Sequence, residues 1–333
     1  MRTRSVNKYK KALLEGGNHG RGRNSTGFSL IELMLALTLG VLITWSVLEI
    51  SLSSLKSSQI LNDSSEINET GRYLTQFLEK EISMAGFLGR LIDIPPKSDG
   101  TLPGRWMCRP LLILDDLTFL IDGLNNMSGS VTLCGTAHKP RAGSDVLMIR
   151  RTGSKEIAYN SSLSAANYYL QAKTGLEDGI TAANQVVKVG AGVWDNFTLK
   201  EMDNTTRVPI YAYRHSFYFV DENKTFRVMH RKNNAWRSEP ITDAVEDFQA
   251  EYGIDTNGDN VADRIGFPAD RDEWQAVVSV KLSILVGGAV PQTIQSNTSF
   301  SYAGKTLSFN DRLKRRLFVS ITEPINLTMR TGD

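Results

Sequence analysis

Oxygen-bearing side chains are spaced like metal ligands in the stretch DTNGDNVAD, residues 255–263. Ca²⁺ takes about six to eight oxygen ligands, and an EF-hand loop supplies them from alternate positions, the seventh through its backbone carbonyl. Those positions are filled here by Asp255, Asn257, Asp259, Val261 and Asp263. Three acids within so short a stretch repel one another unless a cation lies between them. We therefore expect this loop to bind calcium.

Two positions depart from the EF-hand pattern. Asn260 replaces the usual glycine at position 6, a mild change because asparagine tolerates a left-handed backbone. Gly266 stands at position 12, where a bidentate acid is usual. A backbone or water oxygen would have to replace that acid, or one of the acids further along: Asp270, Asp272 or Glu273. The alternative, a hairpin turn after a strand at Gln249–Gly253, stays open.

The chain has two cysteines, Cys108 and Cys134. On the oxidising side of a membrane we expect them to form a disulfide, which would stabilise the fold by ~3–4 kcal/mol in the chain-entropy model. Two separate buried thiols are the alternative. His138 is the one histidine near them, so the set of zinc ligands is incomplete.

No catalytic motif stands out in the sequence. The four histidines are dispersed, at His19, His138, His215 and His230, and the chain contains no G-x-S-x-G, P-loop or H-E-x-x-H pattern. Residues 1–27 hold seven of the 38 basic residues and one of the 36 acids, which leaves a slightly acidic body. The sequence therefore predicts neither an enzyme nor a nucleic-acid-binding protein.

A long apolar run near the N-terminus carries an acid, Glu32, close to its start. From Phe28 to Ile50 it carries two formal charges, Glu32 and Glu49, and it is long enough to cross a bilayer. A carboxylate at the centre of such a helix costs ~2.5–3.5 kcal/mol, so an acid there is usually functional. The bland alternative is that Glu32 snorkels to the membrane surface. The basic residues ahead of the run predict a cytoplasmic N-terminus and an external body.

The segment Gly27-Phe28-Ser29-Leu30-Ile31-Glu32, preceded by basic residues and followed by the apolar run, resembles the class III signal of type IV prepilins. This resemblance implies that a prepilin peptidase cuts after Gly27 and methylates the new amino group of Phe28. It also implies that Glu32 acts in subunit assembly, where the amino group of a neighbouring subunit would offset its charge. The leader, residues 1–27, is long for this family.

The helix is predicted to continue beyond the membrane. No proline interrupts Phe28–Ala85, apolar residues recur at helical spacing up to Ile82, and Gly86 stands where a C-terminal cap belongs. We assign residues 28–50 to a transmembrane or filament-core helix and residues 51–86 to its amphipathic continuation, which Gly71 is expected to soften. The stretch 71–87 is similar to the end of the long helix in PilW-type minor pilins and J-type pseudopilins.

Residues 87–333 read as a β-rich head. Short apolar runs broken by Gly, Pro, Asn and Asp predict strands at Leu111–Leu114, Val131–Cys134, Asp145–Arg150, Gln185–Val189, Ile210–Val220, Thr225–His230, Trp274–Val286 and Arg315–Ile321. We further expect a turn at Glu222–Lys224, a helical turn at Thr242–Phe248 and a loop at Gly287–Lys305. The expected fold class is α+β and type IV pilin-like: a long N-terminal helix packed on a mostly antiparallel β head.

The resemblance implies a minor pilin that primes pilus assembly or caps the tip. Its implied partners are other minor pilins, the major pilin, the prepilin peptidase and, before assembly, the inner membrane, with the head in the periplasm and later on the cell surface. Two alternatives stay open: a J-type pseudopilin of a type II secretion system, and a membrane-tethered periplasmic enzyme.

Overall fold

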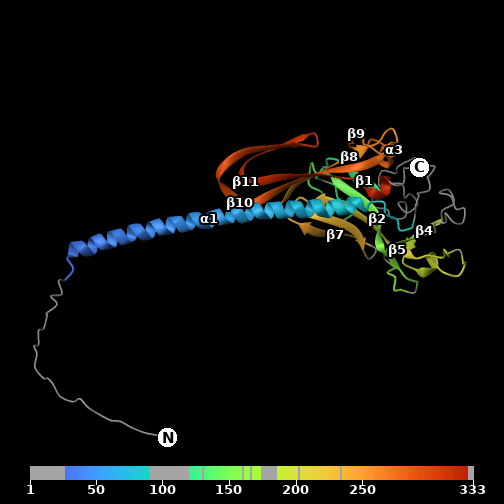
Figure 1. The fold of residues 1–333 in the computed structure, drawn as a ribbon, viewed down its shortest axis with the longest axis horizontal. Helices are drawn as coiled ribbons and strands as arrows, with labels where there is room; N and C mark the ends of the chain where they lie inside the picture. Colours follow the sequence, from blue (N-terminus) through green and yellow to red (C-terminus); the bar gives the residue numbers. More distant parts are fainter. Residues whose placement is uncertain are drawn as a thin grey trace, which may run out of the picture. The chain divides into compact units, whose positions relative to one another are not determined.

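The computed structural model describes residues 27–90, 120–129, 131–159, 161–165, 167–173, 186–201, 203–232 and 235–328 (Figure 1). The chain forms two compact units, Met1–Lys56 and Ser57–Asp333. Helix α1 (Leu30–Ser83) contributes to both, within the span predicted to be helical.

In the first unit α1 is mostly apolar and exposed. All its side chains up to Lys56 are exposed, and the helix is long and apolar enough to cross a membrane. The hydroxyl groups in this run donate to carbonyls three or four residues earlier: Thr38 to Leu35, Thr44 to Gly40 and Val41, and Ser46 to Leu42. These local bonds satisfy the hydroxyl groups without water.

In the second unit α1 buries one face. The buried residues recur every three or four positions: Asp63, Ile67, Gly71, Leu74, Leu78 and Ile82. That spacing places them in a single stripe along the helix. Just after the helix, Gly86 has a φ of 75°, the left-handed conformation expected of a C-terminal cap, and its N–H donates to the carbonyl of Arg150.

Two antiparallel sheets make up the described part of the head (Figure 1). The first sheet has the order β1 (Ile121–Leu124), β2 (Val146–Ile157), β5 (Ile210–Val220), β3 (Tyr168–Lys173) and β4 (Val186–Ala191), and β6 (Phe226–Lys232) and β7 (Ala235–Thr242) join it beside β5. The second has the order β11 (Lys305–Thr322), β10 (Val277–Tyr302), β8 (Val245–Ile254) and β9 (Arg264–Gly266). Three short helices complete the described elements: η3 (Trp194–Asn196), α3 (Arg271–Gln275) and α4 (Ile325–Thr328).

The main core lies where α1 meets both sheets. Leu74, Leu78 and Ile82 of α1 are fully buried together with residues of β2, β5, β8 and β10. Successive residues of a strand point to opposite faces. Accordingly Leu147 and Tyr218 face this core, whereas the neighbouring side chains of β2 and β5 fill a second cluster on the other face of the first sheet. The predicted α+β class, a long helix packed on antiparallel strands, is confirmed.

The most extensive error of the sequence analysis concerns Gly287–Lys305, which is not a loop. β10 continues to Tyr302 and forms a hairpin with β11. The turn is at Ala303 and Gly304, with φ values of 48° and 71°, as the common two-residue hairpin turns require. Ser299 pairs with Ser308, and Ser301 with Thr306, through side-chain hydrogen bonds of 2.9 Å. Such cross-strand hydroxyl pairs stabilise a sheet, so a polar sequence forms a strand here.

Smaller corrections concern three other segments. Thr242–Phe248 does not form a helical turn, because β8 begins at Val245 and pairs with β10. Val131–Cys134 does not form a strand: Val131 and Thr132 have no regular structure, and Leu133 and Cys134 lie in a bend and a turn. Trp274 belongs to α3, and the strand after it begins at Val277. The predicted strand at Leu111–Leu114 lies outside the described residues. β5 has the predicted bounds, and the chain then turns through Asp221 and Lys224 into β6.

Candidate functional site

Gly27 and Phe28 lie directly before α1, outside any helix or strand. A Cβ atom built on Gly27 meets nothing within 4 Å. The fold therefore gives no steric reason for a glycine at this position. The Phe28 side chain is 83% exposed, so the bond between the two residues lies in a non-helical segment next to an exposed side chain.

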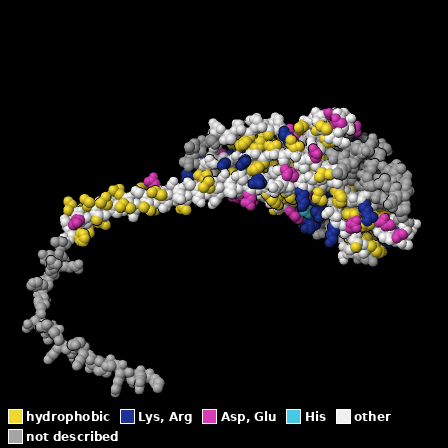
Figure 2. Space-filling view, viewed as in Figure 1, with side chains coloured by type: hydrophobic (Ala, Val, Ile, Leu, Met, Phe, Trp, Pro, Cys, Tyr) yellow, Lys and Arg dark blue, Asp and Glu magenta, His cyan; other side chains and the backbone are white. Residues whose placement is uncertain are grey.

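Glu32 lies in the first turn of α1. A carboxylate there interacts favourably with the free N–H groups at the start of a helix. Its neighbours along the helix, Leu30, Ile31 and Leu33, are exposed apolar side chains. Figure 2 shows hydrophobic side chains gathered along this half of α1. Among the described residues Glu32 forms no ion pair, and its side chain is exposed.

Residues 255–263 form the loop that joins β8 to β9. The Asp255 carboxylate accepts hydrogen bonds from the backbone N–H groups of Asn257 (3.0 Å), Gly258 (2.7 Å) and Asn260 (2.7 Å). Desolvation raises the pKa of Asp255, but these backbone hydrogen bonds outweigh it and lower the pKa overall. Gly258 and Asn260 have φ values of 83° and 62°. The left-handed conformation expected of Asn260 is therefore present.

Hydrogen bonds connect the remaining candidate ligands of the loop. The Asn257 side-chain amide lies 3.2 Å from Asp259 Oδ2 and 3.3 Å from Asp263 Oδ1. Asp263 also accepts from the hydroxyl and the N–H of Thr256, which lowers its pKa. In the described part of the chain no three His, Cys, Asp or Glu side chains are grouped so as to hold a metal ion. Calcium binding by this loop stays a prediction.

Two acids named as substitutes for the twelfth ligand have other partners. Asp270 caps α3 by accepting from the N–H of Glu273 at 3.0 Å. Glu273 in turn forms an ion pair with Arg264 and accepts from the N–H of Ala269. Asp272 stays exposed in the first turn of α3.

Cys134 is partly buried beside the cluster that contains Met127 and Leu133. Cys108 lies outside the described residues, so the disulfide between the two cysteines stays a prediction.

Two acids of α1 that the sequence analysis did not single out attach the helix to the head. Asp63 Oδ1 accepts from the N–H groups of Ala289 (2.7 Å) and Val290 (3.1 Å), where β10 departs from its regular register. A Cβ on Gly288 would overlap the Asp63 carboxylate, so glycine is required there. One sequence feature could have identified Asp63: it lies four residues before Ile67, on the same face of the helix as the buried apolar residues.

Glu81 is the second of these acids. Its two carboxylate oxygens accept from Arg151 of β2 at 2.8 and 3.0 Å, and the Tyr218 hydroxyl of β5 donates to it at 3.0 Å. Desolvation and the Glu81 carboxylate both raise the pKa of Tyr218, which therefore stays a donor. A two-pronged Arg–carboxylate pair in a nearly buried position fixes geometry as well as charge.

Comparisons with known proteins relate the chain to type IV pili. No curated protein sequence matches the chain. The structure is similar to a type IV-like pilin from Thermus thermophilus at 12% sequence identity, over 66% of this chain and 93% of that one. The TM-score is 0.31, too low to support an argument. Residues 217–326, from the middle of β5 to the start of α4, match the model of the family described as type IV pilus-assembly protein W, PilW. The match of this region to the family model confirms the predicted resemblance to PilW-type pilus proteins.

Proposed function

We propose that this chain is a minor pilin of a type IV pilus. A prepilin peptidase cuts it after Gly27 and methylates the amino group of Phe28. The subunit waits in the inner membrane with its head in the periplasm. It then enters the filament with other minor pilins and the major pilin, where it helps to prime assembly or forms part of the tip. The PilW match supports the link to pilus assembly.

The observation that carries the proposal is the state of the first part of α1. Every residue from Leu30 to Lys56 is exposed, and the apolar surface of this part of the helix has no cover within the described chain. A soluble protein rarely leaves so large an apolar surface in water. A bilayer covers it before assembly, and the helices of neighbouring subunits cover it afterwards.

Glu32 gives this surface a register. A carboxylate placed among apolar side chains needs a compensating partner. The new amino group of Phe28 on a neighbouring subunit is a cation of the right kind, at the same end of the helix. Gly40 is a second feature of this surface: a Cβ built there would meet nothing within 4 Å. The fold of the single chain does not require a glycine there, whereas close contact between membrane helices favours one.

The matched pair Glu32→Ala and Glu49→Ala tests this proposal. Both substitutions remove one acid from the same exposed helix, but only Glu32 lies next to the processed end. We expect Glu32→Ala to be inserted and cleaved normally, yet to be reduced at least tenfold in sheared filaments relative to the membrane fraction. Glu49→Ala should enter filaments like the native chain. Incorporation of the Glu32→Ala chain into filaments at the level of the native chain would refute the assembly role.

A further inference from the structure

The first sheet opens into a fork beside β5. One edge of β5 pairs with β2 along most of its length. The other edge is shared: β3 pairs with it at Tyr211 and Ala212, and β6 pairs with it from Ser216 onward. Among the described strands none pairs with residues 213–215 on that edge. β3 and β6 therefore diverge from β5 and leave an interval of sheet edge between them.

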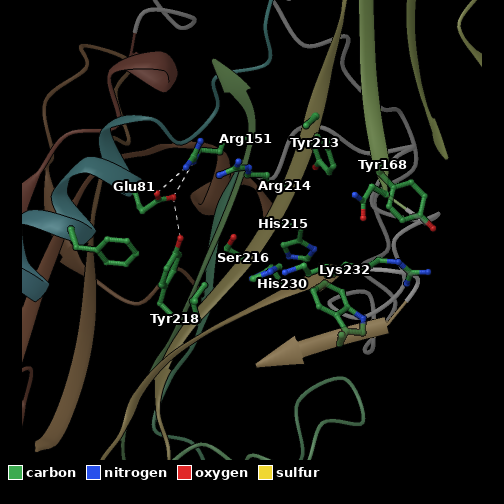
Figure 3. A pocket seen from close by; sticks show the side chains of 16 residues that line it. Glu81, Arg151, Tyr168, Tyr213, Arg214, His215, Ser216, Tyr218, His230 and Lys232 are labelled. Carbon is green, nitrogen blue, oxygen red and sulfur yellow. Dashed lines mark hydrogen bonds and ion pairs between the residues drawn. The ribbon is translucent and has the colours of Figure 1, made fainter. Parts of the chain in front are cut away.

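A cavity of about 460 Å³ lies at this fork. Figure 3 shows its lining, to which β5, β6 and the end of α1 contribute most of the labelled residues. Six residues matter for the argument: Tyr168, Arg214, His215, His230, Lys232 and Trp236. The volume is in the range of pockets that hold small ligands or a few side chains of a bound peptide.

The lining carries an excess of positive charge. Arg151, Arg214, Arg231 and Lys232 line the cavity, and Glu81 is the only acid among the described lining residues. Glu81 is already engaged by Arg151 and Tyr218. At the rim Lys232 lies 3.7 Å from Glu239, but both side chains are about half exposed, so this contact neutralises little. The cavity is therefore suited to an anion.

The lowered pKa of His230 is a second sign of the excess positive charge in the cavity. Its pKa is lowered by desolvation, and Lys232 and Arg214 lower it further, against the opposing effect of Glu239. Cations that disfavour a proton on a neighbouring histidine also favour a carboxylate placed between them.

His215 adds a buried polar group that lacks a partner. The residue is 8% exposed, and its Nε2 is buried without a hydrogen-bond partner among the described residues. Its ring lies against those of Phe217 (4.7 Å between centroids) and Trp236 (5.5 Å). Desolvation and the nearby Arg150 lower its pKa well below the usual value, so the ring is neutral. A buried polar atom without a partner is unfavourable, and a bound polar group can supply the missing hydrogen bond.

We propose that this fork cavity binds an extended acidic segment of a partner protein. Its carboxylates pair with Arg214 and Lys232, its backbone runs along β5 at residues 213–215, and its apolar side chains contact Tyr168 and Trp236. A peptide fits these features together, because an extended chain adds to a sheet edge through its backbone while side-chain pockets supply specificity. The inference does not depend on processing of the N-terminus.

Binding of a fluorescein-labelled peptide that alternates Glu with Phe tests the proposal, measured by fluorescence anisotropy on the full chain in detergent micelles. The control peptide has Gln in place of Glu. We expect micromolar binding of the acidic peptide and at least tenfold weaker binding of the control. We also expect the double variant Arg214→Glu, Lys232→Glu to weaken binding at least tenfold, since both side chains are exposed and their replacement does not disturb the core.

The matched variant Arg312→Glu, Lys314→Glu makes the same change of charge on β11, away from the cavity. It should bind within twofold of the native chain. Should either charge-reversal variant fail to fold, Arg214→Gln with Lys232→Gln takes the place of the cavity variant, with Arg312→Gln and Lys314→Gln as its control. No binding, equal binding of both peptides, or equal losses in the two variants would overturn the proposal. So would displacement of the peptide by millimolar inorganic phosphate or by an oligonucleotide as effectively as by unlabelled peptide, which would indicate a general anion site.

Discussion

At Gly71 the backbone of α1 lies directly against the ring of Phe318 on β11. An alanine Cβ at this position would come within 3.0 Å of three ring carbons of Phe318. Carbon atoms pack comfortably at about 3.5–4.0 Å, so the ring would have to move by more than about 1 Å. Gly71→Ala is therefore the smallest substitution that probes how the helix packs on the second sheet.

Two opposing effects set the size of the change in stability. Overpacking of this kind costs about 1–3 kcal/mol. Replacing glycine by alanine inside a helix returns about 1 kcal/mol through helix propensity. We therefore expect Gly71→Ala to lower the free energy of unfolding by about 1 kcal/mol. In a Phe318→Ala background the clash is gone, so the same substitution should raise it by about 1 kcal/mol.

Urea unfolding of the compact unit Ser57–Asp333, followed by circular dichroism, measures the four members of this double-mutant cycle. The expected coupling is about 2 kcal/mol. Ser65→Ala, at an exposed position of the same helix, controls for propensity alone and should not depend on Phe318. If Gly71→Ala stabilises the native and the Phe318→Ala backgrounds equally, the ring does not lie against the helix and the reasoning fails.

Two other predictions concern protonation and calcium. His215 has a folded-state pKa well below the usual value, so as the pH falls below about 6.5 the unfolded chain takes up a proton that the folded chain does not, and stability falls by up to about 1.4 kcal/mol per pH unit. His215→Gln should remove this part of the pH dependence in urea titrations from pH 7 to 5; an unchanged slope would contradict it. Calcium at a hundredfold excess over its Kd should stabilise Ser57–Asp333 by about 2.7 kcal/mol and raise its Tm by several degrees, whereas magnesium should not. Asp255→Ala with Asp259→Ala should abolish the shift and Asp272→Ala should not; no shift, or one that survives the double substitution, would exclude the site.

The elements that could be predicted from sequence are those with strong local patterns. The apolar run and the stripe that ends at Ile82 predict α1, because a 3.6-residue period over so long a span has few other interpretations. β5 is rich in aromatic and β-branched residues, and its predicted bounds, Ile210–Val220, are those observed.

Tertiary pairing explains the errors. The polar arm of β10 has the composition of a loop, and its strand conformation depends on pairing with β11. TDAVEDF has a helix-like composition, yet Val245 to Gln249 are buried in β8. In both cases long-range partners override local propensity.

The contacts that organise the head depend on which distant segments meet. Asp63 and Glu81 are ordinary polar residues of a helix until β10 and β2 supply their partners. His215 and His230 are dispersed in sequence, and the pairing of β5 with β6 brings them to one cavity. The fork that forms this cavity follows from the order of strands in the sheet, which no local pattern encodes.

The mature N-terminus tests the central claim most directly. Mass spectrometry of the chain purified from its own cells, with and without an active prepilin peptidase, identifies the first residue and its modification. The account predicts a chain that begins with N-methylated Phe28 in the first case and one that retains residues 1–27 in the second. An intact Met1 in cells with active peptidase, or a mature chain that begins near Lys56, would contradict it.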